Sequence, residues 1–297
     1  MGNHSLENVN AESLFRRVAI VGLGLLGGSW GLALKKAGFT GRIAGYARRA
    51  ETRAQALGKG AVDEGFAEVT EAVHGADLVI LATPVAVILD HLARLPPHLP
   101  PRALVTDVGS TKRRICERAA ELYPHEPLFL GGHPMAGKER SGLENADARL
   151  FLGARYVLTP VEQEDLHDPR VQAFRALVES IGARPLVCDP AAHDRAVAYL
   201  SHLPQLLSSG LASLMEEQQA AEELMLAASG FRDVTRLADS PYSVWRDICL
   251  TNTANIQTAL DALIHKLETM KMHLASRELE GEFQAAHRLR DKLRELG

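Results

Sequence analysis

The 297 residues are enough for one large or two medium-sized domains. With 46% hydrophobic and 24% charged residues the composition is that of a globular protein, and the net charge of −4 gives no broad basic face for nucleic acid. The apolar stretches are too short to cross a membrane, and the polar first dozen residues do not resemble a signal peptide. Three widely spaced cysteines show no metal-ligand spacing, so we expect a cytoplasmic protein without a bound metal.

Apolar runs and helical patterns alternate from residue 17 to residue 189. The expected strands are 18–21, 41–47, 76–84, 102–110, 127–134, 154–160 and 183–189, with helices at 29–36, from Pro84, at 111–122 and at 171–181. Alternation of this kind predicts a mostly parallel sheet with helices on both faces. Residues 1–16 are expected to form a flexible N-terminal segment.

The strand patterns stop after Asp189, and long apolar segments with helical spacing follow. They predict an all-helical second domain over residues 190–297, with a kink or a break at Pro204. There is no internal repeat and no low-complexity linker, so we expect the two domains to meet through a firm interface.

Gly22, Gly24 and Gly27 form a G-x-G-x-x-G pattern between the first strand and the first helix. In a Rossmann-type domain the first glycine permits a tight turn, the second lets the backbone approach a pyrophosphate, and the third lets the helix pack on the strand. The start of the helix offers free N–H groups to the phosphates. The predicted cofactor-binding residues are Gly22, Gly24, Leu25, Leu26, Gly27, Arg48, Arg49, Thr83, Pro84 and Ser110.

The stretch "GYARRAE", residues 45–51, lies where an acidic residue would bind the adenosine ribose of NAD. Here Ala47 takes that place, and Arg48 and Arg49 follow it. Guanidinium groups suit a phosphate dianion, so this stretch favours NADP, through its 2′-phosphate, over NAD as the alternative. Both arginines could instead be ordinary surface residues at the start of a helix.

Two further segments, "TDVGSTK" and "GGHPMAGKERSG", stand at the carboxyl ends of later strands, where open parallel sheets bind their ligands. The first contains Ser110 and the second contains His133 in a glycine-rich loop. A lone histidine is more often structural than catalytic, but the position of His133 favours a catalytic role, with Ser110 close enough to share a hydrogen bond.

The glycine loop, "ATP" at 82–84, "TDVGSTK", "GGHPMAG", "SHLPQ" and "SGFRDVTR" occur in the order seen in prephenate and arogenate dehydrogenases. The chain resembles this TyrA-type family over nearly its whole length. The resemblance implies oxidative decarboxylation of a cyclohexadienol, arogenate or prephenate, in tyrosine biosynthesis. At the cofactor stretch the chain is similar to the NADP-using arogenate members.

The resemblance also implies individual roles and an assembly. His133 would accept the proton of the substrate hydroxyl, and Ser110 would touch both that histidine and the nicotinamide. Arg236 would bind a substrate carboxylate, and His202 would help to bind the substrate from the helical domain. The C-terminal helices would form a homodimer.

Two other interpretations stay open. A β-hydroxyacid dehydrogenase or imine reductase would also join a dinucleotide-binding domain to a helical one, although "GGHPMAG" argues against it. A non-catalytic NADP-sensing protein would need the glycine loop and the arginines, but neither His133 nor Arg236.

Overall fold

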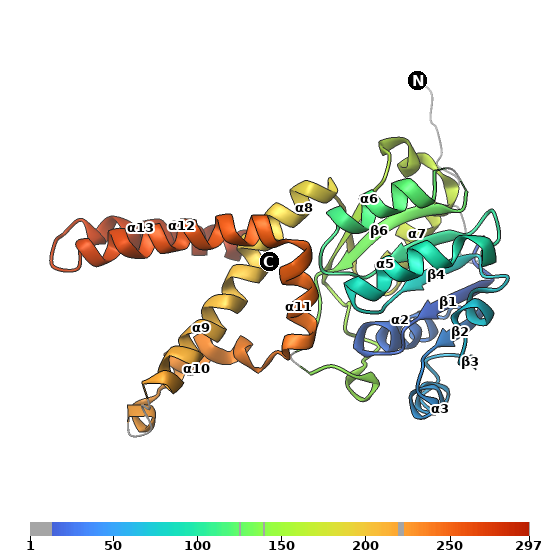
Figure 1. The fold of residues 1–297 in the computed structure, drawn as a ribbon, viewed down its shortest axis with the longest axis horizontal. Coiled ribbons are helices and arrows are strands. Elements are labelled where there is room, and N and C mark those ends of the chain that lie inside the picture. Colours follow the sequence, from blue (N-terminus) through green and yellow to red (C-terminus); the bar gives the residue numbers. More distant parts are fainter. Residues whose placement is uncertain (1–13, 125, 139, 219–222, 297) are drawn as a thin grey trace.

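The computed structural model describes residues 14–124, 126–138, 140–218 and 223–296. The chain first forms an eight-stranded sheet with helices on both faces, and then a helical region that extends away from the sheet (Figure 1). This arrangement confirms the expected Rossmann-type, mostly parallel sheet followed by an all-helical C-terminal part.

The strands lie in the order β3-β2-β1-β4-β5-β6-β7-β8. Their bounds are β1 (Arg17–Val21), β2 (Arg42–Tyr46), β3 (Glu64–Phe66), β4 (Leu78–Leu81), β5 (Leu104–Asp107), β6 (Leu128–Pro134), β7 (Arg155–Pro160) and β8 (Arg184–Val187). Neighbouring strands run parallel except β6 and β7, which are antiparallel. The central strands β4 and β5 are buried along their whole length, as their apolar sequences predict.

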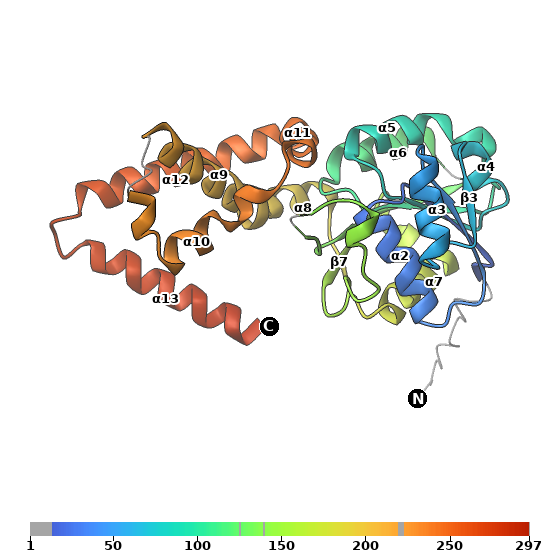
Figure 2. The same ribbon diagram turned by 90° about the horizontal axis from the view of Figure 1, so that it is seen from below.

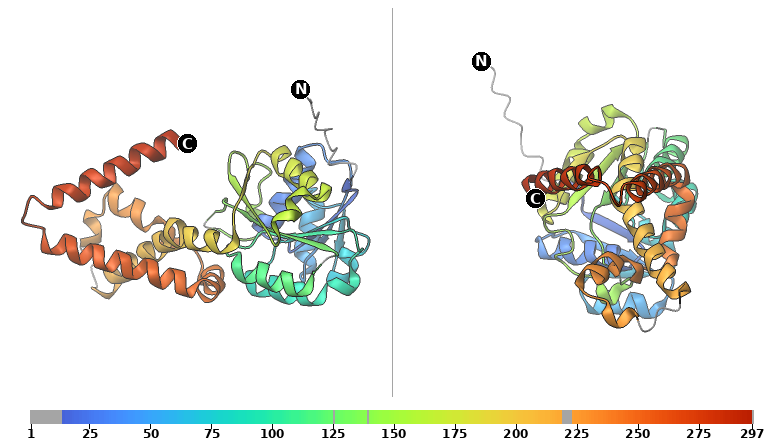
Figure 3. Two further views of the ribbon diagram at one scale, coloured as in Figure 1. Left: turned by 90° about the horizontal axis from the view of Figure 1, so that it is seen from above. Right: turned by 90° about the vertical axis from the view of Figure 1, so that its left-hand side faces the viewer.

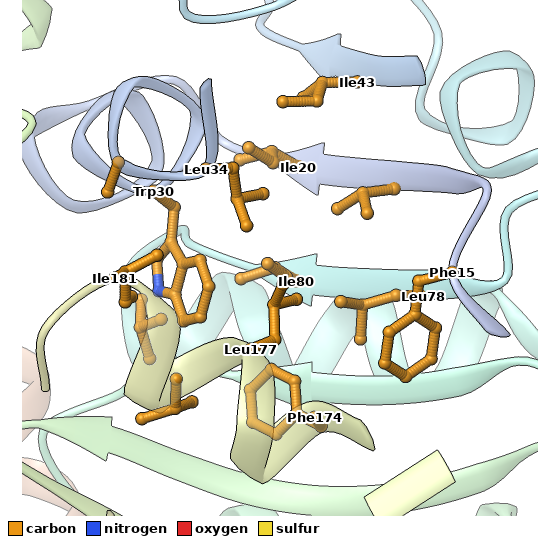
Figure 4. Close-up of a cluster of buried hydrophobic side chains, with 14 of the residues drawn as sticks. Phe15, Ile20, Trp30, Leu34, Ile43, Leu78, Ile80, Phe174, Leu177 and Ile181 are labelled. Atoms are coloured by element: carbon orange, nitrogen blue, oxygen red, sulfur yellow. The ribbon is translucent and has the colours of Figure 1, made fainter. Parts of the chain in front are cut away.

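One face of the sheet is covered by α2 (Leu25–Lys36) and α7 (Pro169–Ser180). Trp30 from α2 stacks on Phe174 from α7 with ring centroids 5.9 Å apart, above Ile20 and Ile80 of the sheet (Figure 4). The helix that follows the glycine loop is thereby fixed by a large aromatic contact.

Other helices cover the opposite face and one edge of the sheet. The opposite face packs against α4 (Val69–Val73), α5 (Val85–Arg94) and α6 (Arg113–Leu122), through a second cluster that includes Ile88, Leu92 and Ile115 (Figure 2). The short helix α3 (Ala50–Gly58) follows β2 and contributes the buried Ala56.

The described residues of the C-terminal region, 190–218 and 223–296, form helices and no strand. Its main helices are α8 (Pro190–Val197), α9 (Leu203–Glu217), α10 (Ser229–Thr235), α11 (Tyr242–Thr251), α12 (Thr253–Met272) and α13 (Leu279–Leu296). A π-helical turn over Ala198–His202 joins α8 to α9, and Pro204 lies in the first turn of α9. The irregularity expected at Pro204 is thus a π-turn that ends just before it. Figure 3 shows that α12 and α13 form a hairpin that extends away from the sheet.

Two aspartates tie the helical region to the sheet. Asp247 of α11 accepts a hydrogen bond from the Ala86 N–H at the start of α5, at 3.0 Å. Asp194 of α8 accepts the N–H groups of Lys112 and Arg113 at the start of α6, at 2.7 and 3.1 Å. Both carboxylates lie at the positive end of a helix, so they satisfy free N–H groups and the helix dipole together.

The structure differs from the sequence prediction in local detail. Helix α2 starts at Leu25, directly after Gly24, and not at residue 29. The short elements β3 and α4 were not expected. Phe15, which the prediction placed in the N-terminal segment, is buried in the core. Among the described residues no helix combines the length and the apolar character needed to cross a membrane.

Candidate active site

Four loops meet at one edge of the sheet, because β1, β4, β5 and β6 are parallel and end there. Gly22, Thr83 and Ser110 lie on the loops after β1, β4 and β5, and His133 lies near the end of β6 itself. The structure therefore brings the predicted glycine loop and the predicted catalytic residues to the same edge, the usual ligand-binding edge of such a sheet.

Each of the three glycines of the loop lies in a different environment, which explains why a side chain would or would not fit there. Gly22 has φ +105°, and a Cβ there would lie 2.6 Å from the carbonyl oxygen of Ala82. A Cβ on Gly27 would lie 1.9 Å from the carbonyl oxygen of Gly22, so only glycine allows the helix to approach the strand. A Cβ on Gly24 would meet no protein atom within 4 Å, so the space above Gly24 is open to a ligand.

The surroundings of the loop fit a bound dinucleotide. No side chain caps the start of α2, where Gly24 is followed by Leu25 and Leu26, so its first N–H groups face the open space. The hydroxyl of Thr83 is buried and has no hydrogen-bond partner in the described part of the chain. A buried hydroxyl without a partner costs free energy, which a polar ligand would recover. Pro84 stands beside it as the N-cap of α5.

Arg48 and Arg49 follow β2 directly, beside the glycine loop. Tyr46, the last residue of β2, accepts a hydrogen bond from the Gly22 N–H at 3.0 Å. Both arginines are exposed, and among the described residues neither guanidinium forms an ion pair. Arg53 donates to the carbonyl oxygens of Ala47 and Arg48 at 2.7 and 3.0 Å, which fixes the backbone of this stretch.

His133 begins a chain of polar contacts that crosses from the sheet to the helical region. Its Nδ1 lies 2.9 Å from Nε2 of His193. Nδ1 of His193 in turn lies 2.8 Å from Oδ1 of Asp194. His193 and Asp194 are buried, and both belong to α8.

A buried ion pair between Lys112 and Asp107 holds the backbone of β6 next to His133. Nζ of Lys112 donates to Oδ2 of Asp107, and it also donates to the carbonyl oxygen of Gly132 at 2.7 Å. Oδ1 of Asp107 accepts the Gly132 N–H at 3.1 Å. Neither Lys112 nor Asp107 is exposed to solvent. The pair fixes the end of β6 one residue before His133.

His133 and His202 both have a lowered pKa, so their neutral forms are favoured near neutral pH. Burial is the main cause that holds the pKa of His133 well below its ordinary value of 6.5, and electrostatic repulsion from His193, Lys112 and His202 lowers it further. The pKa of His202 is lowered to about 4, mainly by burial. A neutral His133 has one ring nitrogen free to accept a proton.

His202 lies at the end of the π-turn and is buried. Its Nδ1 is 3.3 Å from Nδ2 of Asn252, which also donates to the Asp194 carbonyl oxygen at 2.8 Å. Because the amide nitrogen is the donor, Nδ1 of His202 accepts and its Nε2 carries the proton. Trp245 packs edge-on against the ring at 5.8 Å.

Arg236 borders a cavity of about 300 Å³ between the loop that follows β6 and the helical region. The cavity is lined by Lys138, Arg140, Asn145, Arg236 and Asp239. Three of these five residues are cationic, which suits a ligand with carboxylate groups. Arg236 and His202 are thus both supplied by the helical region, as predicted.

Ser110 is partly buried in the loop that follows β5, but in the described residues no hydrogen bond joins it to His133. His133 instead forms a hydrogen bond with His193, which the sequence prediction did not include. Lys112, Asp194 and Asn252 were missed as well. Lys112 could have been noticed, because a lysine at the start of a helix opposes the helix dipole and needs another purpose.

Comparison with known proteins agrees with this geometry. Residues 30–187 match the model for the nucleotide-binding domain of prephenate dehydrogenase, and residues 189–289 match that for its dimerization domain. The prephenate dehydrogenase of Bacillus subtilis (strain 168) is 34% identical over 275 residues, which cover 90% of this chain and 72% of that protein.

Two solved structures are similar over nearly the whole chain. One is prephenate dehydrogenase from A. aeolicus in complex with hydroxyphenyl propionate and NAD+, with a TM-score of 0.86, 30% identity, and coverage of 94% of this chain and 98% of the other. The other is Synechocystis arogenate dehydrogenase, with a TM-score of 0.77, 32% identity, and coverage of 93% and 99%.

The sheet order, the glycine loop and the all-helical second part define a two-domain dinucleotide-binding protein. Within that class, the matches over both parts show which family this is. The chain belongs to the prephenate dehydrogenase family.

The glycine loop gives a first prediction, from a matched pair of variants. Gly27→Ala places a methyl group against the Gly22 carbonyl and should lower the free energy of unfolding by roughly 1–3 kcal/mol. Gly24→Ala meets no protein atom, so it should leave the unfolding temperature unchanged and weaken dinucleotide binding. Thermal unfolding and titration with the dinucleotide measure the two effects, and a Gly24→Ala protein that binds normally would contradict the assignment.

Proposed function

We propose that the protein is an oxidoreductase that decarboxylates a cyclohexadienol, arogenate or prephenate, in tyrosine biosynthesis. The observation that carries the proposal is the position of His133, a neutral imidazole at the edge of the sheet where the glycine loop also lies. Membership of the prephenate dehydrogenase family supports the same reaction.

Different residues of the chain accept the proton, bind the substrate and contact the nicotinamide. His133 accepts the proton of the substrate hydroxyl as a general base. Arg236, with the cationic residues around its cavity, binds a substrate carboxylate, and His202 donates a hydrogen bond to the substrate through Nε2. Ser110 contacts the nicotinamide side of the site. A bound nicotinamide would supply the acceptor for the hydride.

The cofactor that we propose is NADP. Arg48 and Arg49 are exposed next to the glycine loop, and Ala47 puts no negative charge against a 2′-phosphate. NAD is the alternative, and it is the cofactor present in the similar structure from A. aeolicus.

We further propose two domains, 17–189 for the dinucleotide and 190–297 for substrate and dimerisation, and a homodimer in a reducing cytoplasm. The helical region exposes large apolar side chains, among them Leu200, Met225 and Leu226 with exposed fractions of 77%, 86% and 84%. Apolar surface of this extent favours an interface. The three free cysteines support the reducing compartment.

The two other interpretations carry less support. A β-hydroxyacid dehydrogenase or imine reductase is disfavoured by the match of both parts of the chain to prephenate dehydrogenase. A non-catalytic NADP-sensing protein would have no use for a buried histidine chain beside the cofactor loop or for a cationic cavity.

The cofactor preference gives the second prediction. In assays with prephenate and with arogenate, each with NADP and NAD, NADP should be preferred. Replacing Arg48 and Arg49 by Ala should remove about 1.5–3 kcal/mol of charge-assisted hydrogen bonding, or roughly ten- to a hundred-fold in NADP affinity. Arg42→Ala is the matched control, because Arg42 is exposed at the opposite end of β2. Equal discrimination by the double variant would disprove the role of the two arginines.

The pH dependence gives the third prediction. His133 must be neutral to act as a base, and its pKa lies below 6.5 because it is buried beside His193, Lys112 and His202. A lowered pKa keeps the base form present at lower pH, so kcat/KM should be flat near neutral pH. It should fall only as the pH drops below 6.5, through the lowered pKa. A midpoint above 6.5 would contradict this account.

Two variants separate the roles within that site. His133→Ala should lower kcat by roughly 10²- to 10⁴-fold, the range for a lost general base. Arg236→Ala should mainly raise KM for the substrate and leave NADP affinity near that of the wild type. Circular dichroism confirms the fold of both, and a folded His133→Ala enzyme with normal kcat would remove His133 from the mechanism.

The assembly gives the fourth prediction. Light scattering should give about twice the chain mass of 32.3 kDa. The double variant Ile264→Asp and Leu267→Asp, on an exposed face of α12, should shift the protein toward monomer, because it buries two charges in a dimer interface. Leu57→Asp on α3 is the control, since Leu57 is similarly exposed but belongs to the sheet domain. A wild-type protein of monomer mass at micromolar concentration would exclude the dimer.

A further inference from the structure

Two buried residues, His193 and Asp194, form a hydrogen-bonded chain with Nδ1 of His133. The proposed reaction has so far given them no role. His193 and Asp194 belong to α8, at the start of the helical region, whereas His133 ends a strand of the sheet. The distances of 2.9 Å from His133 to His193 and 2.8 Å from His193 to Asp194 make a continuous hydrogen-bonded chain. Each link joins a ring nitrogen to a single partner atom, so the protons along it can be assigned in order.

The assignment begins at Asp194. Its Oδ1 accepts the Lys112 N–H and its Oδ2 accepts the Arg113 N–H, so both oxygens act as acceptors at the start of α6. Nδ1 of His193 must therefore carry the proton that it shares with Oδ1. In a neutral His193, Nε2 is then an acceptor, and it receives the Nδ1 proton of His133.

This order leaves Nε2 of His133 without a proton, which is the state that a general base requires. We propose that His193 and Asp194 are positioning residues for the reaction: they hold His133 in the tautomer with a free Nε2, and they place a carboxylate where it stabilises the proton that His133 gains. The inference rests on the proposed function, and it extends the proposed site to a pair of residues on a different structural unit.

The electrostatics of the site explain why such support is needed. His133 is partly buried, and its surroundings, including His193, Lys112 and His202, disfavour a positive charge on it. The charge of Lys112 is compensated by Asp107, which also binds the backbone of β6. The carboxylate of Asp194 is already oriented by two backbone N–H groups, so it requires no rearrangement when the proton arrives.

A purely structural role is the competing explanation, because Asp194 also joins α8 to α6. The two explanations differ in whether the side chain at position 193 must accept a hydrogen bond. If the contact only fills space between the two regions, an apolar ring of similar size should serve as well as an imidazole. If it sets the tautomer, the substitute must offer an acceptor to Nδ1 of His133.

The fifth prediction is a direct measurement on the unmodified protein, by nitrogen-15 NMR of histidine-labelled enzyme. The His133 signals, identified by their loss in His133→Gln, should show Nδ1 protonated and Nε2 unprotonated at neutral pH. A protonated Nε2 would overturn the proposal. This readout needs no substrate, so it can fail while the dehydrogenase activity stands, and it can succeed even if the proposed reaction is wrong.

Two substitutions of His193 then test the consequence for the reaction. The amide oxygen of Gln in His193→Gln can accept from Nδ1, so kcat should stay within about ten-fold of the wild type, whereas His193→Phe should lose roughly 10²-fold or more. NADP affinity should change in neither. The same NMR signals should show the Nε2-protonated tautomer in His193→Phe, and the acid limb of kcat/KM should shift in that variant.

His98→Gln is the matched control, because His98 is exposed and distant in the fold, at the turn after α5. Folding is checked by circular dichroism and NADP binding, and the wild-type NMR measurement decides the question if His193→Phe does not fold. Equal kcat values for the Phe and Gln variants would show that His193 serves only packing, and would overturn the proposal.

Discussion

A lysine without solvent exposure holds the carboxyl edge of the sheet together. Nζ of Lys112 binds Asp107 at the end of β5 and the Gly132 carbonyl on β6, while its backbone N–H binds Asp194 of the helical region. One residue therefore connects two strands and a helix. Removing one partner of such a buried pair leaves an uncompensated charge, at a cost of about 3–5 kcal/mol. The position of His133, one residue beyond Gly132, depends on this arrangement.

The contact between the sheet and the helical region is also made by hydrogen bonds from backbone N–H groups to carboxylates. Helices α5 and α6 both begin at the ligand-binding edge, and neither start is capped by its own N-cap side chain. Asp247 and Asp194, from the helical region, supply the missing acceptors. The helical region is therefore fixed at the carboxyl ends of the strands, next to the start of α5 and α6.

Patterns that repeat along the chain could be predicted from the sequence, whereas contacts between distant residues could not. The glycine loop, the central strands and the all-helical second part follow from periodicity and from single glycines, and the structure confirms them. The antiparallel direction of β7 is not encoded in its apolar sequence. His193 was hidden in a helical pattern, because its partner His133 is 60 positions away in the chain. The expected hydrogen bond from Ser110 to His133 is not among the contacts of the described residues, in which Nδ1 of His133 instead lies 2.9 Å from Nε2 of His193.

Two long helices of the C-terminal region, α9 and α12, bury few apolar side chains within a single chain. The buried residues of α9 are Gln205 and Ser208, and those of α12 are Ile256 and Ala259. Large apolar side chains on the same helices face outward, among them Leu214 and Ile264, and a large exposed apolar patch is typical of an interaction surface. The glycine loop, by contrast, is supported by Trp30 and the aromatic cluster under α2. The glycine loop is thus supported within one chain, as is His202 through Asn252 and Trp245, whereas the outer faces of α9 and α12 carry exposed apolar side chains.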